Sequence, residues 1–235
     1  MNEQKSIKEK KVKFEKLVAK RKEFKFSDPE LVNPSQIEGG MYDKENYLNP
    51  WDKWHGNLDA KILLIGQDWG SEEYYRNLKG EYDKDVTTNL TNANLRKLFK
   101  EIGFDNIDEN HDIPLFFTNA VLGMKKGKMD KQVKEKWYLE TANEFIKPLI
   151  NIVNPEIIIA MGEAAYKTIA EIYELRVKPL KEIVGKKPID LSDGKKLFVV
   201  FHCSPRSCQM NRSLDLQKED WRKIKEYIDQ NSISI

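Results

Sequence analysis

Four short apolar runs divide the chain, and stretches with helical periodicity separate them. Within each run the apolar residues are continuous rather than alternating, which is typical of strands covered on both faces of a parallel sheet. Strands that alternate with helices predict an α/β fold, in which helices cover both faces of a parallel sheet. The expected strands are residues 62–65, 114–119, 155–160 and 197–201.

Helical periodicity occurs before, between and after these runs. Asn92 is a candidate N-cap for a helix that ends near Gly103. A long irregular segment, residues 26–57, combines turn residues with several aromatic side chains, which either anchor the segment to the core or line a pocket. The other expected helices cover about residues 3–25, 131–150, 163–174 and 215–229.

The charge distribution separates the first 25 residues from the rest. The 235 residues carry a net charge of +2, but residues 1–25 hold ten Lys or Arg against four Asp or Glu, so the remainder is slightly acidic. We expect a basic helical arm at 1–25 and a single domain at 26–235, because no linker or repeat divides the longer part. The arm either contacts nucleic acid or is the solvated face of a helix, which is the more common role of such a run.

The composition argues against several classes of protein. No apolar run approaches the roughly 20 residues of a membrane span, and the first residues lack the apolar core of a signal peptide. We therefore expect a cytoplasmic protein with no membrane partner. The two cysteines, Cys203 and Cys208, are too few for a cluster held by four thiolates, and the three histidines show no metal-ligand spacing. No metal and no cofactor are expected.

Polar side chains follow three of the expected strands. Asp68, Asn119 and His202 each come just after an apolar run, and the carboxyl ends of parallel strands meet at one edge of a sheet, where ligands bind. An amide can read the edge of a base, an imidazole can donate to a carbonyl that gains negative charge, and a carboxylate can orient water. This pattern predicts a pocket at the sheet edge, although any one such residue is more often structural.

The residues around these side chains resemble known motifs. Gly66-Gln67-Asp68 is similar to the water-activating motif of the uracil-DNA glycosylase superfamily, which reads Gly-Gln-Asp-Pro-Tyr in the best-known branch. The run from His202 to Ser207 resembles the second motif of that superfamily, His-Pro-Ser-Pro-Leu-Ser, and residues 118–122 are similar to the strand end with its uracil-reading asparagine. The order and strand context of all three agree, and the resemblance spans about residues 60 to 228.

The resemblance implies a DNA glycosylase that flips uracil, or a related damaged base, out of DNA and hydrolyses its N-glycosidic bond. Asp68 would position the attacking water and stabilise the cationic sugar, and His202 would donate to uracil O2. Asn119 would read the uracil edge and reject cytosine, and Gln67 would add backbone contacts to the base. The second motif would contact DNA, its serines gripping phosphates, through Ser204, Pro205, Arg206 and Ser207.

The resemblance also implies a three-layer α/β/α sandwich with a four-stranded parallel sheet, and a monomer. No cofactor is implied because water is the nucleophile, and two cysteines disfavour the branches with an iron–sulfur cluster. Two other hypotheses remain open. One is a relative that binds nucleic acid or a nucleotide without cleaving it, and the other is an unrelated α/β enzyme acting on a small polar substrate.

Several positions depart from the superfamily pattern. Trp69 and Gly70 stand where the best-known branch has proline and the tyrosine that blocks the thymine methyl group, so either Trp69 takes over that exclusion or the pocket accepts a different base. Arg206 replaces the leucine that fills the hole left by the flipped base. Cys203 replaces a proline that stiffens the loop, and Glu163 replaces a serine that grips phosphate.

The aromatic side chain that stacks on uracil in the superfamily has no evident counterpart. The region 85–92, where it is expected, contains no aromatic residue. Trp51 and Trp54, in the irregular segment, are the alternatives.

Overall fold

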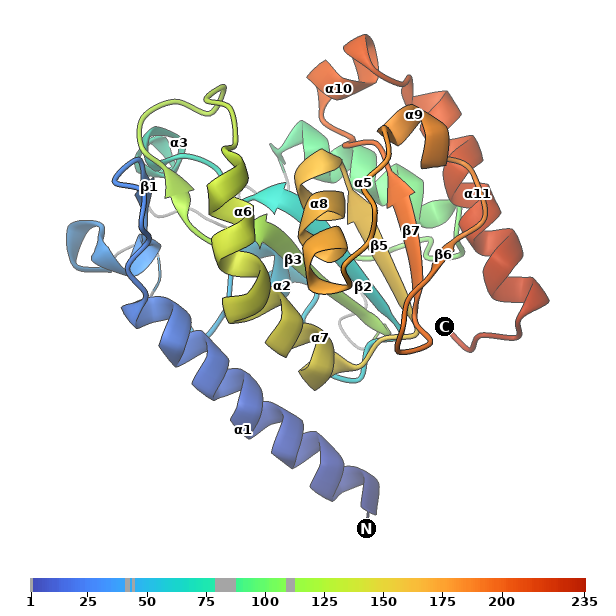
Figure 1. The fold of residues 1–235 in the computed structure, drawn as a ribbon, viewed down its shortest axis with the longest axis horizontal. Helices are drawn as coiled ribbons and strands as arrows, with labels where there is room; N and C mark the ends of the chain where they lie inside the picture. Colours follow the sequence, from blue (N-terminus) through green and yellow to red (C-terminus); the bar gives the residue numbers. More distant parts are fainter. Residues whose placement is uncertain (1, 41–42, 44, 79–87, 109–112) are drawn as a thin grey trace.

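The four apolar runs form the parallel core of a central sheet (Figure 1). The computed structural model describes residues 2–40, 43, 45–78, 88–108 and 113–235. The strand order is β3-β2-β5-β7-β6, and all neighbouring pairs are parallel except β6 with β7. The parallel strands are β2 (Ile62–Asp68), β3 (Leu115–Val121), β5 (Ile157–Met161) and β7 (Lys196–Val200).

The sheet has five strands rather than the expected four. The additional strand, β6 (Ile189–Asp190), is an antiparallel edge strand in the connection before β7. Two residues are too few to produce an apolar run, so the sequence pattern gave no sign of it. A separate two-stranded sheet pairs β1 (Leu31–Val32) with β4 (Met124–Lys125).

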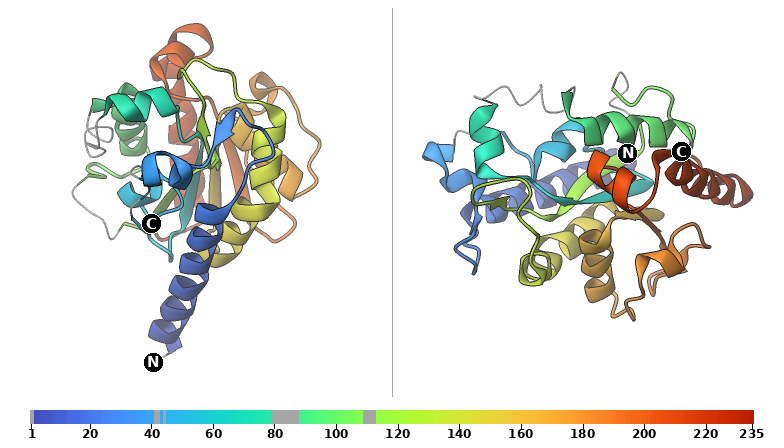
Figure 2. Two further views of the ribbon diagram at one scale, coloured as in Figure 1. Left: turned by 90° about the vertical axis from the view of Figure 1, so that its left-hand side faces the viewer. Right: turned by 90° about the horizontal axis from the view of Figure 1, so that it is seen from above.

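Alternate residues of each parallel strand enter two different cores, which confirms that the strands are covered on both faces. Leu63, for example, faces one core and Leu64 the other. Helices α1 (Asn2–Glu23), α6 (Glu135–Thr141), α7 (Lys147–Val153) and α8 (Glu163–Ile172) pack in the first core. Helices α5 (Leu90–Lys100) and α11 (Leu214–Gln230) pack in the second, giving the three layers seen in Figure 2.

Shorter helices connect these layers. They are α2 (Pro50–Trp54), α3 (Glu72–Asn77), α9 (Leu180–Ile183), α10 (Pro205–Met210) and the 3-10 turns η1 (Pro34–Gln36) and η2 (Glu38–Gly40). A π-helical turn, η3 (Ala142–Ile146), joins α6 to α7. The expected helix at 131–150 is therefore one continuous element that begins later, at Glu135, and contains this turn.

The expected cap of α5 is wrong. The Asn89 side chain accepts a hydrogen bond from the Thr91 backbone and begins the helix, whereas Asn92 lies inside the helix and is buried. Both residues suit a cap by type, and the burial of Asn92 inside the helix distinguishes them.

The N-terminal helix α1 packs on the body through its second half, and Lys10 of its first half donates to the Leu58 carbonyl at 3.0 Å. Leu17 and Val18 are buried in the first core, and Arg21 is fully buried against Asp43, with 2.7 Å between guanidinium and carboxylate. Its first half projects past the amino ends of the strands (Figure 1). Among the described helices, none is both long enough and apolar enough to cross a bilayer.

Candidate active site

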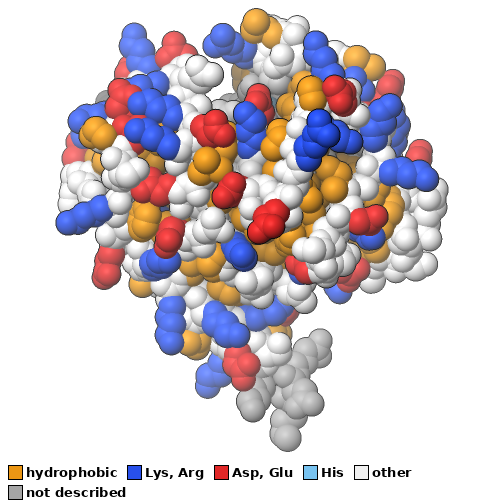
Figure 3. Space-filling view, viewed as in Figure 1, with side chains coloured by type: hydrophobic (Ala, Val, Ile, Leu, Met, Phe, Trp, Pro, Cys, Tyr) orange, Lys and Arg blue, Asp and Glu red, His pale blue; other side chains and the backbone are white. Residues whose placement is uncertain are grey.

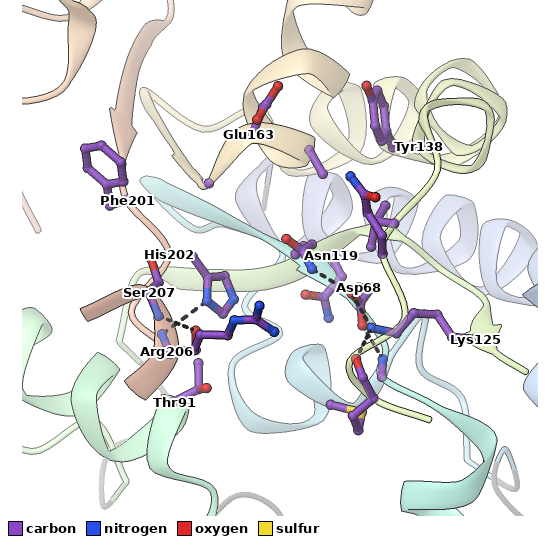
Figure 4. A pocket seen from close by; sticks show the side chains of 18 of the residues that line it. Asp68, Thr91, Asn119, Lys125, Tyr138, Glu163, Phe201, His202, Arg206 and Ser207 are labelled. Atoms are coloured by element: carbon purple, nitrogen blue, oxygen red, sulfur yellow. Dashed lines mark hydrogen bonds and ion pairs between the residues drawn. The ribbon is translucent and has the colours of Figure 1, made fainter. Parts of the chain in front are cut away.

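A cavity of about 1320 Å³ lies at the carboxyl edge of the parallel strands. After β2 the chain forms β3 on one side of β2 and then crosses to form β5 on the other side. This reversal of direction makes the carboxyl edge the topological switch point of the sheet. Asp68, Asn119 and His202 all line the cavity. Figure 4 shows Asp68 and Asn119 together on one wall and His202 on the opposite side.

Asp68, the last residue of β2, is held by hydrogen bonds on both carboxylate oxygens. The Gly70 backbone N–H donates to Oδ1 at 2.7 Å, and the Gln67 side-chain amide donates to Oδ2 at 3.0 Å. Gln67 therefore has a side-chain role, in addition to the backbone contacts expected of it. These bonds fix the carboxylate at the cavity wall.

A lysine that sequence reasoning missed completes the surroundings of Asp68. Lys125 Nζ lies 3.3 Å from Asp68 Oδ2 and donates to the Met129 carbonyl at 2.7 Å. The side chains of Lys125 and Asp68 are only 3% and 7% exposed. Lys125 ends the two-residue strand β4 within a lysine-rich stretch, and lysines in such stretches usually point to solvent, so the sequence carried no signal of its burial. A buried ammonium beside the carboxylate offsets part of its negative charge.

Asn119 lies within β3 rather than after it, and its side chain is almost fully buried. Its Nδ2 donates to Asn49 Oδ1 at 3.2 Å. No donor among the described residues reaches Asn119 Oδ1, although this oxygen is buried. A buried acceptor without a partner costs free energy unless a ligand supplies the donor, so Asn119 is suited to meet an N–H group.

Because Gly66 has no Cβ, the side chains of Asn119 and Trp51 can lie close to the backbone of β2. A Cβ at Gly66 would lie 2.5 Å from Asn119 Oδ1 and 2.4 Å from Cζ3 of Trp51. Trp51 also lines the cavity, whereas Trp54 is buried in the second core and donates its indole N–H to Asp108. Of the two alternatives for a stacking ring, Trp51 is the one placed at the cavity. Residues 85–87 of the region expected to hold it lie outside the described residues.

His202 follows β7 by two residues, and its tautomer is set by a local hydrogen bond. The Ser204 backbone N–H donates to Nδ1 at 3.1 Å, so a neutral imidazole carries its proton on Nε2. Burial lowers the pKa of His202 below its ordinary value; the Asp68 charge opposes this shift and the Lys125 charge adds to it. The site therefore favours a neutral histidine that donates through Nε2.

The family comparison agrees with the three motifs. A model of the uracil DNA glycosylase superfamily matches residues 54–225, which is most of the chain. The chain belongs to the uracil-DNA glycosylase superfamily. It is also similar to the type-4 uracil-DNA glycosylase of Thermotoga maritima, with 26% identity over 178 residues, covering 74% of this chain and 80% of that protein.

The second motif of this superfamily member forms the start of α10. Ser204 caps that helix by accepting from the Ser207 N–H at 3.3 Å, and Pro205 occupies the first turn. Ser207 is buried and accepts from Asn211. Arg206 is exposed, and Figure 4 shows it extending into the cavity beside His202. Ser204 and Ser207 thus have structural partners in addition to any contact with DNA.

Two departures from the superfamily pattern have visible consequences. Trp69 borders the cavity but is mostly buried with Ile37, Tyr75 and Met124, and the Arg21 guanidinium stacks on it at 4.9 Å. Glu163 pairs with Lys167 at 2.8 Å, one helical turn away. The repulsion that a bare carboxylate would exert on phosphate is therefore partly neutralised.

The described residues contain no group of three or more His, Cys, Asp or Glu side chains arranged to hold a metal ion. Cys203 is buried beside Met161, with its thiol directed to the Thr91 carbonyl at 3.4 Å. Burial raises the pKa of this thiol strongly, which leaves it as a packing residue where the superfamily motif has proline.

Proposed function

We propose that this protein is a DNA glycosylase that hydrolyses the N-glycosidic bond of uracil, or a related damaged base, in DNA. The observation that carries this proposal is the convergence of Asp68, Asn119 and His202 on one cavity, with an unfilled acceptor on Asn119. Superfamily membership and the glycosylase relative support the same reaction class.

The proposed mechanism assigns one task to each of the three side chains. Asn119 Oδ1 accepts from N3–H of the flipped base, and the remaining Nδ2 hydrogen donates to the neighbouring carbonyl. Neutral His202 donates through Nε2 to O2 as the departing base becomes an anion. Asp68 orients the water that attacks C1′ and stabilises the positive charge that develops on the sugar.

Trp51 is proposed to stack on the base. It lines the cavity beside Asn119, and a flat indole face can stack on any pyrimidine. Trp69 would shape the pocket from behind, since its ring is mostly buried.

DNA is proposed to bind across the mouth of the cavity. Lysine and arginine side chains gather on either side of the hollow at the upper edge of the face in Figure 3. Arg206 would enter the space that the flipped base leaves, as a charged substitute for the superfamily's leucine. The cationic residues that line the cavity, besides Lys125, are Lys131, Lys167, Lys178, Lys181 and Arg206.

A second candidate is a protein that binds such DNA without excising the base. The observation that favours it is the Lys125–Asp68 ion pair, because an ammonium 3.3 Å from the carboxylate weakens its attraction for a cationic sugar. This candidate predicts binding to uracil-containing or abasic DNA without release of base.

The test is base release under single turnover, with enzyme in excess over oligonucleotides that carry uracil in a single strand, opposite guanine or opposite adenine. We expect release from at least one substrate, and a fall of about 10²- to 10⁴-fold in Asp68→Asn with binding retained. Binding by the wild-type protein without release would favour the second candidate, and absence of both would contradict each.

A further inference from the structure

Asn49 is a buried residue outside the three motifs described above, and the region that the superfamily model matches begins after it, at residue 54. It caps α2 in a local arrangement that its sequence explains: Pro50 occupies the first turn, and Asp52 accepts from the Asn49 N–H at 2.7 Å. Local capping therefore holds the Asn49 backbone and side chain in place behind Asn119, which lines the cavity.

The hydrogen bonds of Asn49 fix which way its amide points. Its Oδ1 accepts from the Trp51 backbone N–H at 3.0 Å, and a backbone N–H can only donate. Its Nδ2 donates to Thr118 Oγ1 at 2.9 Å. The oxygen of Asn49 must therefore face the helix and Asn119, and the nitrogen must face Thr118.

The orientation of the Asn49 amide determines that of the Asn119 amide. Because Asn49 presents an oxygen, Asn119 must present its Nδ2 to it, at 3.2 Å, and so its Oδ1 is the atom left unpaired. If the Asn119 amide flipped, two oxygens would face each other in a buried site, which is costly. The acceptor at the cavity wall is thus a fixed property of the fold.

We propose that Asn49 is a positioning residue that sets base specificity, by locking Asn119 with its oxygen toward the base. This inference rests on the proposed function and assigns its substrate class: bases with an N–H at the position read by Asn119, as in uracil. Cytosine presents a lone pair at N3, which a fixed oxygen repels. Without Asn49 the Asn119 amide can flip, place an N–H at that position and accept cytosine.

The test compares two variants. In Asn49→Ser the hydroxyl still caps α2 but is too short to hold Asn119, whereas Asn49→Asp keeps an acceptor for both Trp51 and Asn119. Excision of uracil and of cytosine from otherwise identical single strands is measured under single turnover. We expect the uracil-to-cytosine rate ratio to fall at least about tenfold in Asn49→Ser and to be kept in Asn49→Asp. Thermal unfolding verifies that both variants are folded.

An unchanged ratio in folded Asn49→Ser would overturn the inference while leaving the glycosylase proposal intact. If the wild-type protein releases no base, the proposed function fails separately, and binding of free uracil and free cytosine, followed by NMR, takes the place of excision. If the wild-type protein prefers uracil and Asn49→Ser loses that preference, the result would support the proposal that Asn49 fixes the orientation of Asn119. Equal binding of both bases by the wild type, or no binding of either, would overturn it.

Discussion

The two ends of β2 carry the same kind of ion pair in opposite surroundings. At the amino end, Lys61 pairs with Glu156 at 2.6 Å, and their side chains are 43% and 46% exposed. At the carboxyl end, Asp68 pairs with Lys125 at 3.3 Å, and both are almost fully buried. Water screens the first pair, whereas the second is enclosed, so charge has its larger effect at the carboxyl end even though the distance is longer.

The largest effect among variants of the residues facing Asp68 is expected at His202. His202→Ala removes the proposed donor to the departing base, and loss of one such donor lowers rates by about 10²- to 10³-fold. Single-turnover release of uracil measures this change, with binding of the uncleaved strand as control. A loss below about tenfold would mean that base release at the carboxyl end of β2 does not depend on this donor.

The comparison of the ion pairs predicts a difference in stability. Lys125→Met leaves a buried carboxylate without its cation and should lower the free energy of unfolding by about 3 kcal/mol. Lys61→Met, the matched change at the exposed end, should cost less than about 1 kcal/mol. Urea unfolding of both variants measures the two values, and equal losses would show that burial does not distinguish the pairs.

The lowered pKa of His202 predicts a pH dependence. The unfolded chain takes up a proton on this imidazole as pH falls through about 6.5, while the folded protein resists doing so until a lower pH. Stability should therefore decrease across this window as pH falls, and the decrease should be smaller in His202→Ala. Unfolding free energies of both proteins between pH 5 and 8 test this, and parallel curves would contradict it.

The smallest effect is expected at exposed Arg206. Arg206→Ala should weaken binding of uracil-containing DNA modestly and reduce the salt dependence of affinity by about one phosphate contact. Fluorescence anisotropy across a salt series measures both quantities. Unchanged affinity and salt slope would remove Arg206 from the DNA-binding surface.

Patterns of apolar and polar residues along the sequence predicted the main strands and the position of the site. Continuous apolar runs located the four parallel strands, and polar side chains near the ends of three of them, Asp68, Asn119 and His202, predicted the edge where the cavity lies. The two-residue strand β6 was missed because it has no pattern of its own.

The remainder depends on contacts between distant residues. Asn49 and Asn119 are 70 positions apart, and no local pattern shows that one orients the other. Lys125 lies in a lysine-rich stretch of sequence, where lysine side chains are usually exposed, and only the fold reveals that it is buried against Asp68. The basic arm is similar: its charge left open either a contact with nucleic acid or a solvated helix face, and only the fold shows that Arg21 is buried against Asp43 and Trp69. We propose that 26–235 is the catalytic domain and that the arm docks on it.

The most direct test of the central claim compares two substitutions at opposite ends of β2. Asp68→Asn and Glu156→Gln each replace a carboxylate with the matching amide, one in the cavity and one at the exposed end. Single-turnover release of uracil should fall at least about 10²-fold in Asp68→Asn and stay within about twofold of wild type in Glu156→Gln. Equal rates in the two variants would contradict the claim that the carboxyl edge of the sheet is the active site.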